Sequence, residues 1–116
     1  DLGMAYMHVA ELTQDPADKQ VRASLYDLAE QKFLQALALG SEQVYYHLAC
    51  LYSLQENGPD SYHYLVKAYE SNTLPPVSDV LDDRWLEFVR STPNFQNFIR
   101  SIKATEDGAI DNLEMN

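Results

Sequence analysis

The chain of 116 residues is poor in cysteine, glycine and basic side chains. Its single cysteine, Cys50, excludes an internal disulfide and with it a disulfide-stapled secreted domain, so we expect a reducing, cytoplasmic location. Eight Lys and Arg stand against 18 Asp and Glu, which gives a net charge of −10. This shortage of bases argues against nucleic acid or an anionic membrane surface as a partner. No apolar run reaches the roughly 18 residues that a membrane helix needs.

Helical spacing of apolar residues dominates what is present. Apolar residues make up 46% of the chain and aromatic residues 11%, enough for one modest core. Apolar positions recur at intervals of three and four, and no segment has sustained strand alternation. We expect helices from Asp15-Pro16 to Gly40, from Ser41 to Glu56, from Asp60 to Leu74, from Ser78 to Val89, and from Thr92-Pro93 to Lys103. The sequence therefore predicts an all-α fold of antiparallel helical hairpins.

Two stretches of the chain repeat one spacing of small and large residues. The matching residues are Leu2, Gly3, Tyr6, Ala29, Phe33 and Ala36 in the first stretch, and Tyr45, Leu48, Ala49, Tyr52, Ser61, Leu65 and Ala68 in the second. Small residues at such positions let two helices approach, and large ones fill the space between them. The pattern resembles the tetratricopeptide repeat. The resemblance implies hairpins stacked as a right-handed α-solenoid.

The first repeat departs from this pattern in length. Tyr52 and Ser61 are separated by nine positions but Tyr6 and Ala29 by 23, so the first repeat carries 14 extra residues. We assign repeat 1 to about residues 1–40 and repeat 2 to about residues 41–76. Because the chain begins inside the first helix of a repeat, we expect an unsatisfied stacking surface at its N-terminal face. Self-association through this face stays open.

The segment after the second repeat resembles the terminal cap of many bacterial tetratricopeptide arrays. The resemblance rests on aromatic residues and on the spacing of an arginine and a proline, and the cap residues are Trp85, Phe88, Arg90, Pro93 and Phe95. Such a cap covers the exposed apolar face of the last repeat, and we place it at about residues 77–103. Residues 104–116 hold four acids and no base, which predicts an acidic, flexible tail.

No group of residues has the composition of a catalytic or metal site. His8 with Glu11 and His47 with Cys50 are pairs, whereas a zinc site needs three or four ligands. A cysteine nucleophile would also need a base and an orienting group at matching positions. We therefore expect no enzyme activity, no cofactor and no metal.

The resemblance implies instead a concave groove, lined by the first helix of each hairpin, that binds a peptide or protein. The groove-facing positions are Met4, Met7, His8, Gln43, Tyr46, Cys50 and Ser53. None of them is Lys or Arg, so a neutral or basic ligand is favoured over an acidic one. For Met4 and Met7, simple packing against neighbouring helices is an equal alternative. The main hypothesis is a non-enzymatic interaction scaffold; a bacterial secretion chaperone and an accessory domain of a larger enzyme are the alternatives.

Overall fold

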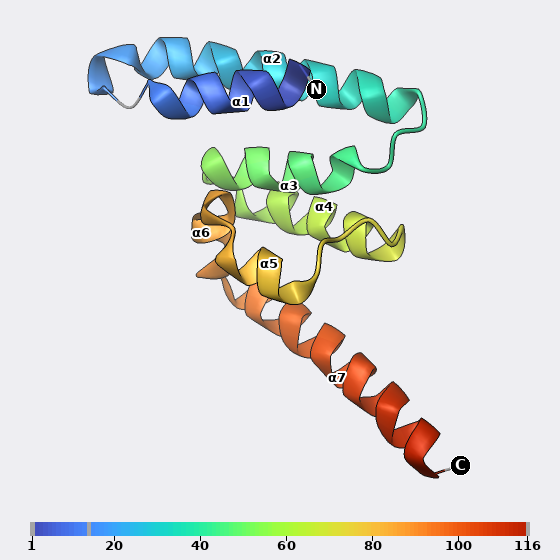
Figure 1. Ribbon diagram of the computed structural model, residues 1–116. Helices are drawn as coiled ribbons and strands as arrows, with labels where there is room; N and C mark the ends of the chain where they lie inside the picture. Colours follow the sequence, from blue (N-terminus) through green and yellow to red (C-terminus); the bar gives the residue numbers. More distant parts are fainter. Residues whose placement is uncertain (1, 14, 116) are drawn as a thin grey trace.

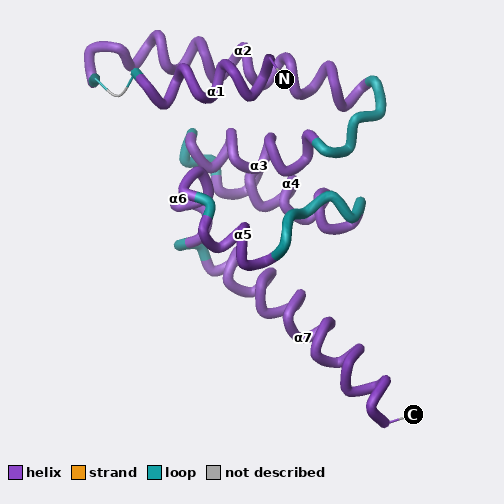
Figure 2. Tube along the Cα trace, viewed as in Figure 1, coloured by secondary structure: helices purple, strands orange, loops and turns teal. Residues whose placement is uncertain are grey.

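The computed structural model describes residues 2–13 and 15–115, with side chains described up to Glu106. The elements are α1 (Leu2–Leu12), the 3₁₀ turn η1 (Pro16–Asp18), α2 (Lys19–Ala38), α3 (Val44–Leu54), α4 (Gly58–Glu70), α5 (Val77–Asp82), the 3₁₀ turn η2 (Arg84–Leu86), α6 (Glu87–Arg90) and α7 (Pro93–Met115). No strand occurs within the described residues (Figure 2). The prediction of an all-α chain is confirmed. Asp1 and Gln14 of the first repeat and Asn116 of the expected tail lie outside the described residues.

The first hairpin is formed by α1 and α2, which lie side by side in opposite directions (Figure 1). Gly3 sets their close approach, because a Cβ atom placed there would lie 2.5 Å from Cε1 of Phe33. Helix α2 has 20 residues against 11 in α1. The extra residues of the first repeat form η1, capped by the Asp15 side chain, and the first turns of α2. Gly40, with φ of +92°, follows the end of α2.

The second hairpin is formed by α3 and α4 and stacks below the first (Figure 1). Asn57 caps α4 by accepting a hydrogen bond from the backbone N–H of Asp60. Ser61 is fully buried, and its hydroxyl donates to the carbonyl of Ala49 at 2.7 Å. The small residue predicted at this helix crossing therefore also contributes a polar contact between the helices.

A single helix was expected from Ser78 to Val89, but the chain breaks it into α5, η2 and α6. The break lies at Asp83, whose backbone is extended (φ −74°, ψ 114°). The Asp83 carboxylate accepts the backbone N–H of Trp85 at 3.0 Å and so starts the next turn. This local cap outweighs the helical periodicity of the surrounding sequence. The segment turns back toward the two hairpins instead of running straight.

Helix α7 leaves the body at an angle and continues to Met115 (Figure 1). The backbone of residues 104–115 continues as helix, whereas the flexibility predicted for residues 104–116 stays a prediction. The acidic composition suggested disorder, but this stretch contains no proline, and a lone glycine does not stop a helix that is already formed.

One continuous core joins both hairpins to the C-terminal segment; its largest fully buried side chains include Met7, Phe33, Leu48, Leu51, Leu65 and Leu86. The packing prediction is wrong for Leu2, which is 53% exposed, and the covering role predicted for Phe88 is only partial, since that ring is 37% exposed. The neighbours needed to bury Leu2 are absent because no element packs on the outer side of α1 within the described residues. Trp85 and Phe95 are buried, as a cap requires.

Candidate partner-binding surfaces

The predicted groove residues divide into buried and accessible positions. Met7, Cys50 and Ser53 are buried, so in this structure they are not available to a ligand. Met4 and Tyr46 are half-buried, and His8 and Gln43 are exposed. The prediction that all seven line an open groove is therefore wrong for Met7, Cys50 and Ser53.

The chain's own C-terminal segment covers the groove side of α3. The hydroxyl of Tyr46 donates to Oδ2 of Asp83 at 2.6 Å. The Cys50 thiol lies 3.8 Å from the same oxygen, and the Ser53 hydroxyl accepts the backbone N–H of Val89 at 3.3 Å. The three α3 positions expected to contact a peptide thus contact Asp83, the residue before η2, and Val89 of α6.

The segment also reaches α1. The ring of His8 lies 5.0 Å from the ring of Trp85 between centroids, and the Arg84 guanidinium forms a 3.0 Å ion pair with Glu11. Residues 83–89 therefore contact both α1 and α3, and they cover the predicted groove positions on α3.

Burial fixes the protonation of the ionisable groups on this face. It is the main cause that raises the pKa of the Cys50 thiol well above its ordinary value, and the Asp83 carboxylate adds to the shift. Burial, followed by Cys50 and Asp83, likewise raises the pKa of Tyr46. Burial lowers the pKa of His47, so its imidazole is neutral near pH 7. A protonated, covered thiol lacks the properties of an activated nucleophile.

An open pocket lies between the first hairpin and the C-terminal segment. It encloses about 450 Å³ and is lined by charged residues of both signs, among them Glu11, Arg22, Arg84 and Glu87. Arg22 and Arg84 were not predicted as groove residues, because one comes from the extra residues of the first repeat and the other from the cap. Both residues lie outside the positions that repeat in the sequence, so the repeat pattern could not predict them as lining residues.

The outer side of α1 carries an exposed apolar face. Leu2, Val9 and Leu12 are 53%, 47% and 84% exposed, and together with Ala5 they form one stripe along the helix. In the repeat register, Leu2 and Ala5 correspond to Leu48 and Leu51 of α3.

In the second hairpin the corresponding face is covered by α2. Leu48 and Leu51 are fully buried. The residues on either side of them face α2: the His47 ring lies 5.5 Å from that of Phe33, and burial, followed by the Glu30 carboxylate, raises the pKa of Tyr52. The outer face of α1 is defined by Leu2, Ala5, Val9 and Leu12, and its first two positions match residues that are buried in α3.

Comparison of the chain with protein-family models, with curated proteins and with solved structures finds no match. Among residues 2–13 and 15–115 no helix is both long and apolar enough to cross a bilayer. The residues whose side chains are described, 2–13 and 15–106, include no group of three or more His, Cys, Asp or Glu side chains that could coordinate a metal ion.

Proposed function

We propose that the chain is a non-enzymatic, tetratricopeptide-type interaction module that binds an α-helix of a protein partner on the outer face of α1. The observation that carries the proposal is the exposure of Leu2, Val9 and Leu12 along one side of α1, where Leu2 and Ala5 match the buried Leu48 and Leu51 of α3. Covering a large aliphatic side chain removes enough apolar surface to stabilise a complex by about 1.5–3 kcal/mol per residue. Three such residues on one helix form an apolar stripe of the kind that a partner helix covers.

The concave face is the weaker candidate for the same role. Residues 83–89 already contact Tyr46 and Ser53 there, and a peptide in the same place would have to displace the fully buried Leu86 and Val89. Displacing two buried aliphatic side chains costs several kcal/mol, so the groove is closed to a ligand of ordinary affinity. The partner therefore binds to the surface that the chain leaves open.

A synthetic peptide of residues 19–38 is the direct test, because α2 is the helix that covers the equivalent face of α3. We expect this labelled peptide to bind the full chain in fluorescence anisotropy. The double variant Val9→Lys/Leu12→Lys should weaken binding by at least about tenfold, since two lysines interrupt the apolar stripe. If the partner is a second copy, the same variant abolishes concentration-dependent dimers in sedimentation velocity.

The matched control is Leu34→Lys/Leu81→Lys, which changes the charge equally at two leucines that are 40% and 37% exposed on α2 and α5. Binding to this control should stay within about twofold of the wild type. Absence of peptide binding and of self-association in the wild type, or equal weakening by both pairs, would reject the proposal.

A further inference from the structure

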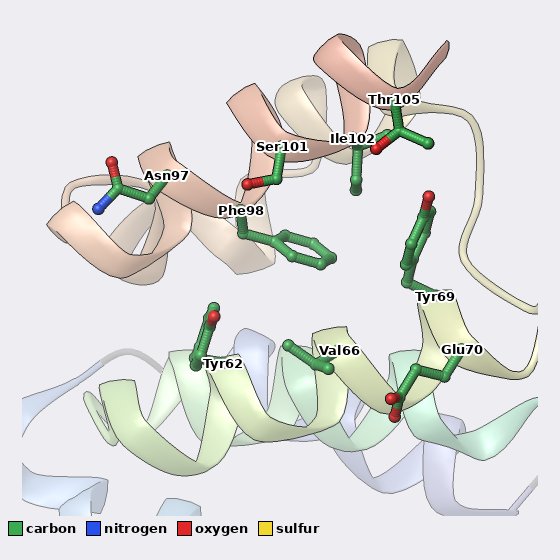
Figure 3. A pocket seen from close by; sticks show the side chains of 9 residues that line it. All are labelled: Tyr62, Val66, Tyr69, Glu70, Asn97, Phe98, Ser101, Ile102 and Thr105. Atoms are coloured by element: carbon green, nitrogen blue, oxygen red, sulfur yellow. The ribbon is translucent and has the colours of Figure 1, made fainter. Parts of the chain in front are cut away.

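A pocket of about 350 Å³ lies between α4 and α7, away from both surfaces described above (Figure 3). Tyr62, Val66 and Tyr69 line it from α4, and Phe98 and Ile102 line it from α7. The Phe98 ring projects into the space between the helices. It meets Tyr62 edge to face at 6.0 Å and 87°, and Tyr69 at 6.0 Å and 88°. The pocket therefore has a rigid aromatic floor, set where α7 diverges from α4.

The rim of the pocket is polar and acidic. Glu70 stands on the α4 side, and Asn97, Ser101 and Thr105 stand on the α7 side (Figure 3). A second depression shares Tyr69 and Ile102 with the pocket and continues the surface to Glu106. Neither Lys nor Arg is among the described residues that line the two depressions, and the chain as a whole carries a charge of −10.

We infer that this pocket is a docking site for a basic amphipathic segment of a partner protein. The aromatic floor takes the apolar side of the segment, because Tyr69 is partly exposed while Phe98 holds its ring in place. The carboxylates of Glu70 and Glu106 face the basic side. A Lys or Arg of the partner gains both from these charges and from the face of a tyrosine ring.

Charge decides between the occupants of this pocket. An acidic peptide would bring like charges against Glu70 and Glu106, and a second copy of this chain would bring a further −10. A neutral apolar segment would leave the acidic rim without counter-charges. A basic segment is the occupant that satisfies both the floor and the rim.

The test uses the full chain and a pair of labelled amphipathic peptides, one of leucine and lysine and one of leucine and glutamate, in fluorescence anisotropy. We expect the lysine peptide to bind and the glutamate peptide not to bind. The variant Glu70→Lys/Glu106→Lys should weaken binding of the lysine peptide by at least about tenfold. Val66→Trp, which fills the pocket without changing the charge, should weaken it to a similar degree.

The matched control is Asp27→Lys/Glu42→Lys, which alters two exposed acids outside the pocket by the same charge. The affinity of this control for the lysine peptide should fall no more than about threefold. A loss of that size is expected from the less negative net charge of the protein alone. Equal weakening by both charge pairs would show diffuse attraction and overturn the inference. Unchanged binding to Val66→Trp, or self-association that Glu70→Lys/Glu106→Lys abolishes, would overturn it too. Circular dichroism melting curves identify any variant that fails to fold, and the remaining variant then decides the question.

Discussion

The Tyr46 hydroxyl and the Asp83 carboxylate, 37 positions apart in the chain, are joined by a 2.6 Å hydrogen bond. This bond ties the groove side of α3 to the residue at which the C-terminal segment turns back. Asp83 also accepts the backbone N–H of Trp85, so one carboxylate both shapes the segment and attaches it. The Asp83 carboxylate therefore contributes both to the turn of the C-terminal segment and to its attachment to α3.

Removing the Tyr46 hydroxyl should loosen this attachment. Tyr46→Phe is expected to lower the free energy of unfolding by about 1–3 kcal/mol, the range for a hydrogen bond to a charged acceptor. Urea denaturation of Tyr46→Phe, Asp83→Asn and the double variant gives the coupling between the two residues. Additive effects of the two substitutions would contradict a direct stabilising contact.

Adding a methyl group at Gly3 should disturb the first hairpin. The new Cβ would lie 2.5 Å from Phe33, so Gly3→Ala is expected to cost about 1–3 kcal/mol in urea denaturation despite the better helix propensity of alanine. Phe33→Leu in the same chain should recover part of this loss. Gly58→Ala is the control, because its Cβ would lie 3.7 Å from the nearest atoms, and its stability should equal or exceed that of the wild type.

The Cys50 thiol should react slowly in the folded chain. It is buried, and burial raises its pKa well above the ordinary value, so little thiolate is present and a reagent cannot reach it. At pH 7.5 we expect labelling by a disulfide reagent to be at least ~100-fold slower than in denaturing urea, since modification must wait for opening of the core. Rapid labelling under native conditions would mean that residues 83–89 leave the groove readily.

Stability should fall as the solution is acidified past the ordinary pKa of histidine. Burial lowers the pKa of His47 in the folded chain, so the unfolded state takes up more protons below about pH 6.5. His47 thus contributes stability that is present above this value and is lost as the pH falls toward its folded pKa. Urea denaturation at pH 7.5 and pH 5.5 should show a smaller loss for His47→Asn than for the wild type. An equal loss in both chains would assign the pH dependence to other groups.

The helices and their pairing follow from local signals in the sequence. Apolar spacing places the hairpins, and Asn57-Gly58-Pro59-Asp60 places the turn between α3 and α4 because Asn57 caps the next helix. The small residues at Gly3, Ala49 and Ser61 mark helix crossings, and each is buried at a close contact between helices. Such patterns need only neighbours that are near in the chain or in the next helix.

The state of the concave face could not be predicted in this way. The segment that covers it begins at Asp83, 37 positions after Tyr46 in the chain. The bond between these two residues depends on a break in helical periodicity that Asp83 creates through one side-chain cap. The α4–α7 pocket depends on the angle at which α7 diverges, which the spacing of Phe98 and Ile102 along one helix does not specify.

The stacking of the elements in a line also determines how the chain comes apart. The radius of gyration of 16.0 Å exceeds the roughly 13 Å expected of a compact domain of this length, because the molecule extends 59 Å along one axis. Each hairpin is held chiefly by the element beside it, so cooperativity passes from neighbour to neighbour. Amide hydrogens should therefore exchange slowest in α3, which contacts α2, α4 and η2, and progressively faster toward α1 and the far end of α7. A partner bound on the outer face of α1 would slow amide exchange in α1. A partner bound between α4 and α7 would slow amide exchange in α7.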